Sequence, residues 1–488
     1  MSTRFATPEQ IAALPPRRRS IILATCCLSL FIVGLDVSAV NVALPSIGSE
    51  LGASGSQLQW VVDAYALVIA SLLTLGGSLG DRLGRKRVFQ VGLVIFAVAS
   101  VLCSLSTSPE MLIAARAIQG IGGSMLNPVA MSIITNVFID PKERARAIGL
   151  WAAAVGVSMA MGPVIGGALV SGIGWEAIFW LNVPICLLAL VLTALFVPES
   201  RAEHARRFDP LGQLLVFTFL ATLTFGIIEG RGLGWTSAPV IGCFAAAAIA
   251  VTTLVVYESR RRQPLIDPRF FRSAPFSGAV ISAVVMFAAM GGFLFLNTLY
   301  LQEVRGMSPL QAGLMTLPMA AASAAFGPIA GRMVAAAGAR RPMLLGGVAI
   351  TVSGLMLVMI GPDTNLWFIG LAYMFFGIGA GLVNPPITNA AIAGMPRSQA
   401  GVASSMTSTG RQVGTSLGVA LFGAIAFAGL DGSIASGLAD AARPAWLIMA
   451  GAGLVIVAVA VAATSTWGIA TARRTAELIE AETGESMA

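Results

Sequence analysis

The sequence predicts an all-α polytopic membrane protein with fourteen transmembrane helices. Hydrophobic residues make up 56% of the 488 residues, charged residues only 11%, and the mean hydropathy is +0.84. A soluble enzyme of this length would carry many more charges. Apolar runs of ~18 residues or more recur along the whole chain, and each is long enough to cross a ~30 Å hydrocarbon core as a helix. The predicted spans are 20–44, 58–80, 87–106, 111–136, 144–171, 176–196, 211–229, 237–257, 274–300, 308–332, 342–361, 365–393, 400–428 and 444–467.

The distribution of lysine and arginine predicts the orientation of these spans. With a cytoplasmic N-terminus, the cytoplasmic segments hold 25 of the 30 basic residues, three lie in external loops and two lie within spans. This bias is the positive-inside pattern, and it predicts that both termini are cytoplasmic. The basic residues are spread over short loops, so the isoelectric point near 9.6 does not indicate a nucleic-acid partner.

Cysteine, histidine and lysine usage gives no sign of a cofactor. All five cysteines lie within predicted spans and the single histidine, His204, lies in a charged loop, which is not the pattern of a disulfide framework or a metal site. The chain has two lysines, Lys86 and Lys142, and neither belongs to a Gly-Lys-Ser/Thr phosphate loop. We therefore expect neither an enzyme nor an ATP-driven pump, and no cofactor.

Two charged residues within the first-half spans are the strongest functional candidates. Asp36 lies ~24 Å along the first span, and Arg116 lies ~8 Å into the fourth span from its external end. Both positions fall in the outer half, so the geometry allows them to pair. Intramembrane charges usually mark ion paths, and we expect Asp36 to exchange protons. A static ion pair is the alternative, and Asp63 is a weaker candidate because a shallow carboxylate can reach water.

The loop after the second span, GDRLGRKR (80–87), carries an unusual concentration of charge. Gly80 and Gly84 are expected to supply backbone angles that a tight turn requires. The basic residues Arg82, Arg85, Lys86 and Arg87 hold the loop on the cytoplasmic side. Topology does not require Asp81, so we expect this carboxylate to meet a helix N-terminus or an arginine and to hold a cytoplasmic gate closed.

The fifth span carries closely spaced glycines that predict a hinge or seal. Gly162 and Gly166 are four residues apart, which allows close helix packing, and Pro163 weakens the helical hydrogen bonds. Gly156 and Gly167 extend the same pattern. Close packing without a hinge is the alternative.

An internal repeat relates the two halves of the chain. GIGGSMLNP (Gly120–Pro128) returns as GIGAGLVNP (Gly377–Pro385), 257 residues later. The repeat predicts two six-helix bundles, at 20–196 and 273–467, with two inserted helices in 197–272 and tails at 1–19 and 468–488. Parallel repeats of this kind place a substrate site near the bilayer midplane. In the second half, Arg411 lies ~16 Å into its span, where it partners Asp36, contacts an anionic substrate group or faces the interface passively.

Several motifs together resemble one transporter family. LDVSAVNVALPSI (35–47), GDRLGRKR (80–87), RAIQGIGGSMLNP (116–128), GVSMAMGPVIGG (156–167) and FDPLGQLL (208–215) are similar to motifs of the fourteen-helix drug:proton antiporters of the major facilitator superfamily. The resemblance covers roughly residues 20–467. It implies the major facilitator fold, a bacterial plasma-membrane exporter driven by the proton gradient, and a role for Arg116 in tuning or relaying the proton of Asp36.

The resemblance also implies further site residues. It suggests that Asp81 meets the start of the thirteenth span, near 398–401. Acidic Glu176 stands where this branch usually has a basic residue, a departure expected to affect substrate entry rather than fold. Polar and soft side chains facing the central axis are the candidates for the substrate pocket: Asn41, Gln119, Asn127, Met159, Phe293, Asn297, Asn384 and Gln412, together with Arg411.

The predicted function is proton-coupled export of drugs or other lipophilic small molecules by a monomer in the lipid bilayer. The same fold exporting a lipid, siderophore or endogenous metabolite is the main alternative. A sensor or assembly protein without transport is a third reading, and the presence of both Asp36 and Asp81 argues against it.

Overall fold

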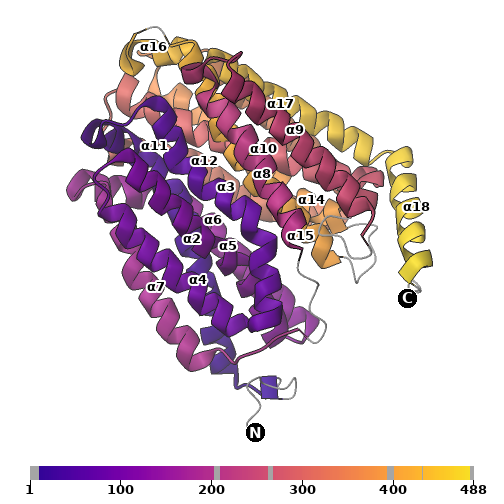
Figure 1. Ribbon diagram of the computed structural model, residues 1–488. Helices are drawn as coiled ribbons and strands as arrows, with labels where there is room; N and C mark the ends of the chain where they lie inside the picture. The colour runs from indigo at the N-terminus through magenta and orange to yellow at the C-terminus, as the bar shows by residue number, and fades with distance from the viewer. Residues whose placement is uncertain are drawn as a thin grey trace. The chain divides into compact units, whose positions relative to one another are not determined.

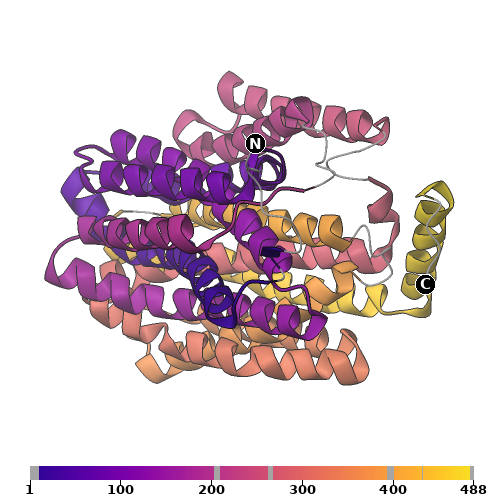
Figure 2. The same cartoon turned by 90° about the horizontal axis from the view of Figure 1, so that it is seen from below.

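The computed structural model describes residues 10–11, 13–202, 209–261, 268–392, 400–430 and 432–483. All regular secondary structure in these ranges is helical. The chain divides into two compact units, 1–217 with 307–314 and 218–306 with 315–488. Each unit is described by itself below, and the views of Figures 1 and 2 show how the helices gather within each.

The N-terminal unit is built from six long helices that follow one another in the sequence. They are α2 (Pro16–Leu51), α3 (Gly55–Leu83), α4 (Arg85–Ser104), α5 (Pro109–Val137), α6 (Pro141–Gly172) and α7 (Glu176–Phe196). Helix α2 packs against α6 and α7, and α5 packs against α3 and α4. In Figure 1 these helices run side by side as one bundle coloured indigo to magenta.

Short turns with capping residues separate these helices. Gly52 ends α2 in the left-handed conformation, with φ 66°. Ser54 and Gln57 form a capping box at the start of α3, and the Asp140 carboxylate accepts hydrogen bonds from two backbone N–H groups at the start of α6. The caps satisfy backbone donors at the helix ends, so the connections stay short.

The C-terminal unit contains most of the remaining helices. After α8 (Pro210–Leu233), which crosses the division between the units, come α9 (Ala238–Ser259), η1 (Pro268–Arg272), α10 (Ala274–Leu299), η2 (Tyr300–Val304), α12 (Leu317–Ala337), α13 (Arg340–Val358), α14 (Leu366–Ile392), α15 (Ala400–Ala428), α16 (Ile434–Ala441), α17 (Arg443–Ala463) and α18 (Thr466–Thr483). Helix α10 packs against α15 and α17, and α14 packs against α12 and α13. The short helix α11 (Pro309–Met315) belongs almost wholly to the N-terminal unit.

Thirteen of the fourteen predicted spans each overlap one long helix, and the tenth overlaps two, α11 and α12. Among the described residues, thirteen segments are long and apolar enough to cross a membrane, and α6 is the remaining predicted span, with a shorter described apolar stretch at Met161–Gly172. The all-helical fold class is therefore confirmed.

Three details differ from the sequence prediction. The tenth span is broken at Thr316 into α11 and α12, beside Pro318, whose ring cannot continue the hydrogen-bond ladder. The ninth span continues as the single-turn π-helix η2. Beyond α17, the predicted C-terminal tail contains α18, which turns sharply away from α17 in both views (Figures 1 and 2).

Candidate buried charge network and interhelical-loop clamp

Asp36 and Arg116 form a buried ion pair in the N-terminal unit. Arg116 Nη1 donates to Asp36 Oδ2 at 2.5 Å, and the two side chains are 1% and 0% exposed. Asp36 comes from the middle of α2 and Arg116 from the second turn of α5. The pairing that the two depths allowed is therefore present, and each charge has its counter-ion within the apolar bundle.

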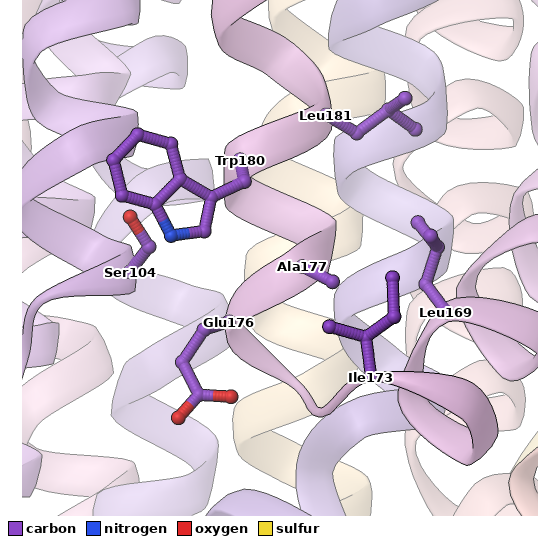
Figure 3. A pocket seen from close by; sticks show the side chains of 7 residues that line it. All are labelled: Ser104, Leu169, Ile173, Glu176, Ala177, Trp180 and Leu181. Carbon is purple, nitrogen blue, oxygen red and sulfur yellow. The ribbon is translucent and has the colours of Figure 1, made fainter.

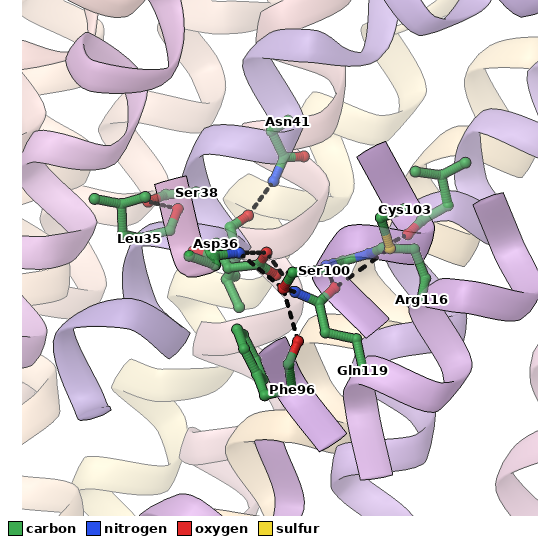
Figure 4. A network of polar contacts seen from close by, with 12 residues as sticks. Leu35, Asp36, Ser38, Asn41, Phe96, Ser100, Cys103, Arg116 and Gln119 are labelled. Atoms are coloured by element: carbon green, nitrogen blue, oxygen red, sulfur yellow. Dashed lines mark hydrogen bonds and ion pairs between the residues drawn. The ribbon is translucent and has the colours of Figure 1, made fainter. Parts of the chain in front are cut away.

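Uncharged amide side chains complete the coordination of the Asp36 carboxylate. Gln119 Nε2 and Asn182 Nδ2 each donate to Asp36 Oδ1 at 3.0 Å. Both amides also donate to Ser100 Oγ, at 3.0 and 3.4 Å, and Gln119 Oε1 accepts from Arg116 Nη1 at 2.6 Å. Figure 4 shows this network, to which α2, α4, α5 and α7 each contribute. Asp36 thus receives three donors without contact to water.

The Arg116 guanidinium is fixed in position by α3 and α7. Its Nε donates to the Val61 carbonyl oxygen at 3.0 Å. Its central carbon lies 4.1 Å from the centroid of the Tyr65 ring and 5.8 Å from that of Phe179. Hydrogen bonds hold the edge of the guanidinium while the aromatic rings lie against its faces, an arrangement suited to a desolvated cation.

Sequence reasoning identified three members of this network and missed three. Asp36, Arg116 and Gln119 were predicted, although Gln119 was assigned to the substrate pocket. Ser100, Tyr65 and Asn182 were not predicted. Asn182 carried a usable signal, because it is an amide within the strongly apolar run of α7, and an intramembrane amide needs a polar partner.

The remaining charged and polar candidates of the N-terminal unit differ in burial and in hydrogen-bond partners. Asp63 lies near the start of α3, as expected, but its side chain is fully buried rather than open to water. Asn41 is 4% exposed and donates to the Val37 carbonyl oxygen, whereas Asn127 is partly buried with an unpartnered Oδ1. The surroundings of Gly156 and of the Met159 side chain lie outside the described structure.

The C-terminal candidates occupy different surroundings. Phe293 is fully buried against Tyr373, Phe376 and Trp446, so it belongs to the core of its unit. Asn297 is also buried, and its Oδ1 lacks a partner. Asn384 is exposed and Gln412 is partly buried. These residues therefore differ in burial and in neighbours, and their assignment to a substrate pocket remains a prediction.

The charged loop after α3 is clamped by the segment that follows α7. Asp81 accepts from Arg85 Nη2 at 3.0 Å, one helical turn away. The Arg85 backbone N–H donates to the Ser200 carbonyl oxygen at 2.8 Å, and the Ala202 N–H donates to the Asp81 carbonyl oxygen at 3.1 Å. The partner predicted for Asp81 near 398–401 lies outside the residues whose side chains are described, so that assignment remains a prediction.

Glu199 is the acid at the centre of this clamp, and sequence reasoning missed it. Its carboxylate accepts from the Lys86 backbone N–H at 3.1 Å and pairs with Arg87 Nε at 3.5 Å, while Lys86 Nζ donates to the Ala194 carbonyl oxygen at 2.7 Å. Burial raises the pKa of the Glu199 carboxyl above its usual value, although the bond from Lys86 and the charge of Arg87 act in the opposite direction. Arg82, by contrast, is exposed.

The two glycines of the loop have different roles. Gly84 has φ 111°, and a Cβ there would lie 2.5 Å from Glu199 Oε1, so both backbone and space require glycine. Gly80 lies within α3, and a Cβ there would lie 2.9 Å from Val129 Cγ2 on α5. Gly80 therefore permits close helix packing and does not supply the unusual backbone angle that we expected.

The glycines of α6 pack directly against neighbouring helices. A Cβ on Gly166 would lie 2.9 Å from Ala39 Cβ on α2, and one on Gly162 would overlap Ser38. A Cβ on Gly167 would overlap the Pro309 carbonyl oxygen of α11. A Cβ on Gly313 of α11 would in turn overlap the Pro163 carbonyl oxygen of α6. These contacts account for the small residues as a packing surface, whereas a hinge at this position remains a prediction.

A separate pocket of about 710 Å³ opens among α4, α6 and α7. Figure 3 shows Glu176 and Trp180 of α7 on one side and Ile173 on the other. Trp180 is 46% exposed, and Ile173 is 79% exposed. None of the predicted pocket residues lines this cavity, and it contains no member of the Asp36 network.

Comparison with known proteins places this arrangement in a family. The model of the Major Facilitator Superfamily matches residues 26–419. The chain belongs to the major facilitator superfamily. It is therefore a multi-pass membrane transporter of small molecules, not an enzyme.

Relatives within the superfamily include resistance proteins. The chain is 35% identical over 418 residues to the multidrug resistance protein Stp of Mycobacterium tuberculosis, covering 86% of this chain and 78% of Stp. It is 37% identical over 399 residues to the methylenomycin A resistance protein of Streptomyces coelicolor, covering 80% and 82%. A crystal structure of the peptide transporter POT with sulfate shares the fold, with a TM-score of 0.67, 15% identity and coverage of 97% and 99%.

Proposed function

We propose that this major facilitator protein exports drugs or related lipophilic small molecules in exchange for protons. The observation that carries the proposal is the fully buried Asp36–Arg116 pair within membrane-spanning helices. An ionisable pair at such a position is costly unless it serves transport. The names of the relatives, multidrug resistance and methylenomycin A resistance, support drugs as the substrate class.

Proton binding at Asp36 would change the balance of charge inside the N-terminal unit. A proton on either carboxylate oxygen neutralises Asp36 and leaves Arg116 as a buried cation without its counter-ion. Breaking a buried pair in this way costs ~3–5 kcal/mol. A cost of this size is enough to move a two-state transporter between its inward-open and outward-open conformations.

The surrounding amides give this switch a defined geometry. Gln119 bridges the two charges, since it donates to Asp36 and accepts from Arg116. Loss of charge on Asp36 therefore weakens the bonds that join α2 to α5 and to α7 at the same time. Under the predicted orientation, the proton enters from outside and leaves to the cytoplasm, while the substrate moves outward.

The proposal is tested by substrate-driven proton movement in inside-out vesicles. A pH gradient is formed in vesicles holding the native protein, Asp36→Asn or Asp363→Asn, and a panel of lipophilic cations, neutral antibiotics and organic anions is added. Asp363 is an exposed loop carboxylate and serves as the matched control. We expect at least one compound to dissipate the gradient with the native protein and Asp363→Asn, and not with Asp36→Asn.

Two other results would contradict the proposal. If Asp36→Asn couples as well as the native protein, the buried pair is a static structural element. If no compound couples with any of the three proteins, drug antiport loses its support, and export of a lipid or metabolite becomes the function to test.

A further inference from the structure

Arg411 is a cation in a membrane-spanning helix that pairs with no carboxylate among the described residues of the C-terminal unit. It lies on α15, eleven residues after Ala400, which is ~16 Å along the helix axis. Its guanidinium donates from Nη2 to Thr388 Oγ1 of α14 at 2.6 Å, and the central carbon lies 5.6 Å from the Phe287 ring centroid of α10. Among the described residues of this unit, no carboxylate forms an ion pair with it.

The hydrogen-bonding capacity of Arg411 is largely unused. Nε is enclosed and has no acceptor within the described structure. A guanidinium has five N–H donors in one plane, and the bond to Thr388 uses one of them. An enclosed donor without an acceptor is destabilising, so the folded unit tolerates a polar group that it does not satisfy itself.

Comparison with Arg116 makes the difference clear. Both arginines lie within membrane spans and both lie near aromatic rings. Arg116 is matched by Asp36, Gln119 and the Val61 carbonyl oxygen, whereas Arg411 is matched only by Thr388. Arg411 is partly buried, and its enclosed Nε has no acceptor among the described residues, so an apolar residue would serve a purely structural role better.

We propose that Arg411 is the substrate-binding cation of the C-terminal unit and that it takes planar organic oxyanions, aromatic carboxylates above all. The Thr388 bond and the Phe287 ring hold the guanidinium plane in place, and a planar carboxylate matches its fork of donors. The inference rests on the proposed export function and narrows its substrate class. It also assigns the substrate charge to a different unit from the proton-binding Asp36.

Glycine contacts keep α15 close to α10 in the two turns that follow Arg411. Cβ atoms added to Gly414 or Gly418 of α15 would overlap the Val284 or Ala288 carbonyl oxygens of α10, respectively. The backbones therefore touch within a turn or two of Arg411, so the side chain is held by rigid, closely packed helices. A positioned cation gives more specificity than a mobile one.

The test measures binding of matched probes to the purified full-length protein in detergent. The probes are aromatic carboxylates of two to four fused rings, their methyl esters and the corresponding trimethylammonium compounds. The proteins are native, Arg411→Gln, Arg411→Lys and Arg443→Gln, the last being an exposed arginine of the same unit that pairs with Asp440. Calorimetric titration gives each dissociation constant.

We expect the native protein and Arg443→Gln to bind a carboxylate ~10-fold or more tightly than its ester. Arg411→Gln should reduce that ratio to about one while leaving ester binding within about twofold, and Arg411→Lys should retain part of the preference. Thermal unfolding of Arg411→Gln should be unchanged or occur at a higher temperature, because an enclosed donor without an acceptor is removed.

Three results would overturn this proposal. They are absence of carboxylate binding, preference for the trimethylammonium probes, and a carboxylate-to-ester ratio that Arg411→Gln leaves unchanged. None of them depends on proton movement, so they are distinguishable from failure of the antiport proposal, which the vesicle experiment on Asp36 decides.

Discussion

Asp36 and Arg116 pair with each other, so the losses of unfolding free energy caused by replacing each of them should not be additive. Arg116→Gln leaves the buried carboxylate with two neutral amide donors and no counter-ion, and we expect a loss of ~3–5 kcal/mol in unfolding free energy. The double variant Asp36→Asn/Arg116→Gln removes both charges and should be more stable than Arg116→Gln alone. Unfolding of the four proteins of this double-mutant cycle in one detergent provides the measurement. Equal, additive losses would mean that the two charges do not interact.

Glu199 should make the stability of the loop clamp depend on pH in a definite direction. Its pKa lies above the ordinary value of 4.5, so the folded protein retains a proton that the unfolded chain has already lost. Stability from this group is therefore greatest at and below that ordinary value and falls as pH rises through the elevated pKa. The Glu199→Gln side chain does not titrate, so the stability of this variant lacks that pH-dependent contribution.

Thermal unfolding of the native protein and of Glu199→Gln between about pH 4 and pH 7 tests the direction of this pH dependence. The native protein should lose stability relative to the variant as pH rises. A relative gain by the native protein would mean that the ion pair with Arg87 outweighs the cost of burying the carboxylate.

At the scale of the helices, the contact between α2 and α6 should tolerate no added methyl group. Gly166→Ala places a Cβ 2.9 Å from Ala39 Cβ, and we expect a loss of ~1–3 kcal/mol through overpacking, with reduced transport. Gly172→Ala is the matched control on the same helix, since its Cβ would meet nothing within 4 Å. Thermal unfolding and vesicle transport of both variants give the comparison. If the two variants behave alike, the close approach of α2 and α6 is not needed for function.

Helix positions were predictable because the hydrocarbon thickness sets a minimum length for every span. Local departures were not predictable in the same way. The break at Thr316 and the π-turn at Tyr300–Val304 arise from hydrogen bonding over a few residues, which leaves the hydropathy of the span unchanged. Helix α18 was missed because its polar sequence resembles a solvated tail.

Some site residues were likewise predictable from the sequence, and others were not. Asp36 and Arg116 stand out because charge is rare within apolar runs, so sequence position alone indicates them. Asn182 and Ser100 contribute through distances between helices that no local pattern records. Glu199 was hidden for the same reason, since its partners Lys86 and Arg87 lie more than a hundred residues earlier in the chain.

At the scale of the whole molecule, the basic loops predict that both termini lie in the cytoplasm. Protease-cleavable tags placed at each end should be cut in inside-out vesicles and protected in intact cells. A tag in the predicted external loop that contains Asp363 should show the reverse pattern. Protection of the two terminal tags in inside-out vesicles would invert the orientation and, with it, the direction assigned to proton flow.

The clamp around the loop at Gly84 also imposes an order on biosynthesis. The Lys86 N–H and the Glu199 carboxylate that it meets are 113 residues apart, so the bond cannot form until α7 has left the ribosome. Until then, Arg87 lacks its carboxylate partner and remains free to act as a topological signal during insertion. The bond between the ends of α3 and α7 therefore forms only after the polypeptide through Glu199 has been synthesised.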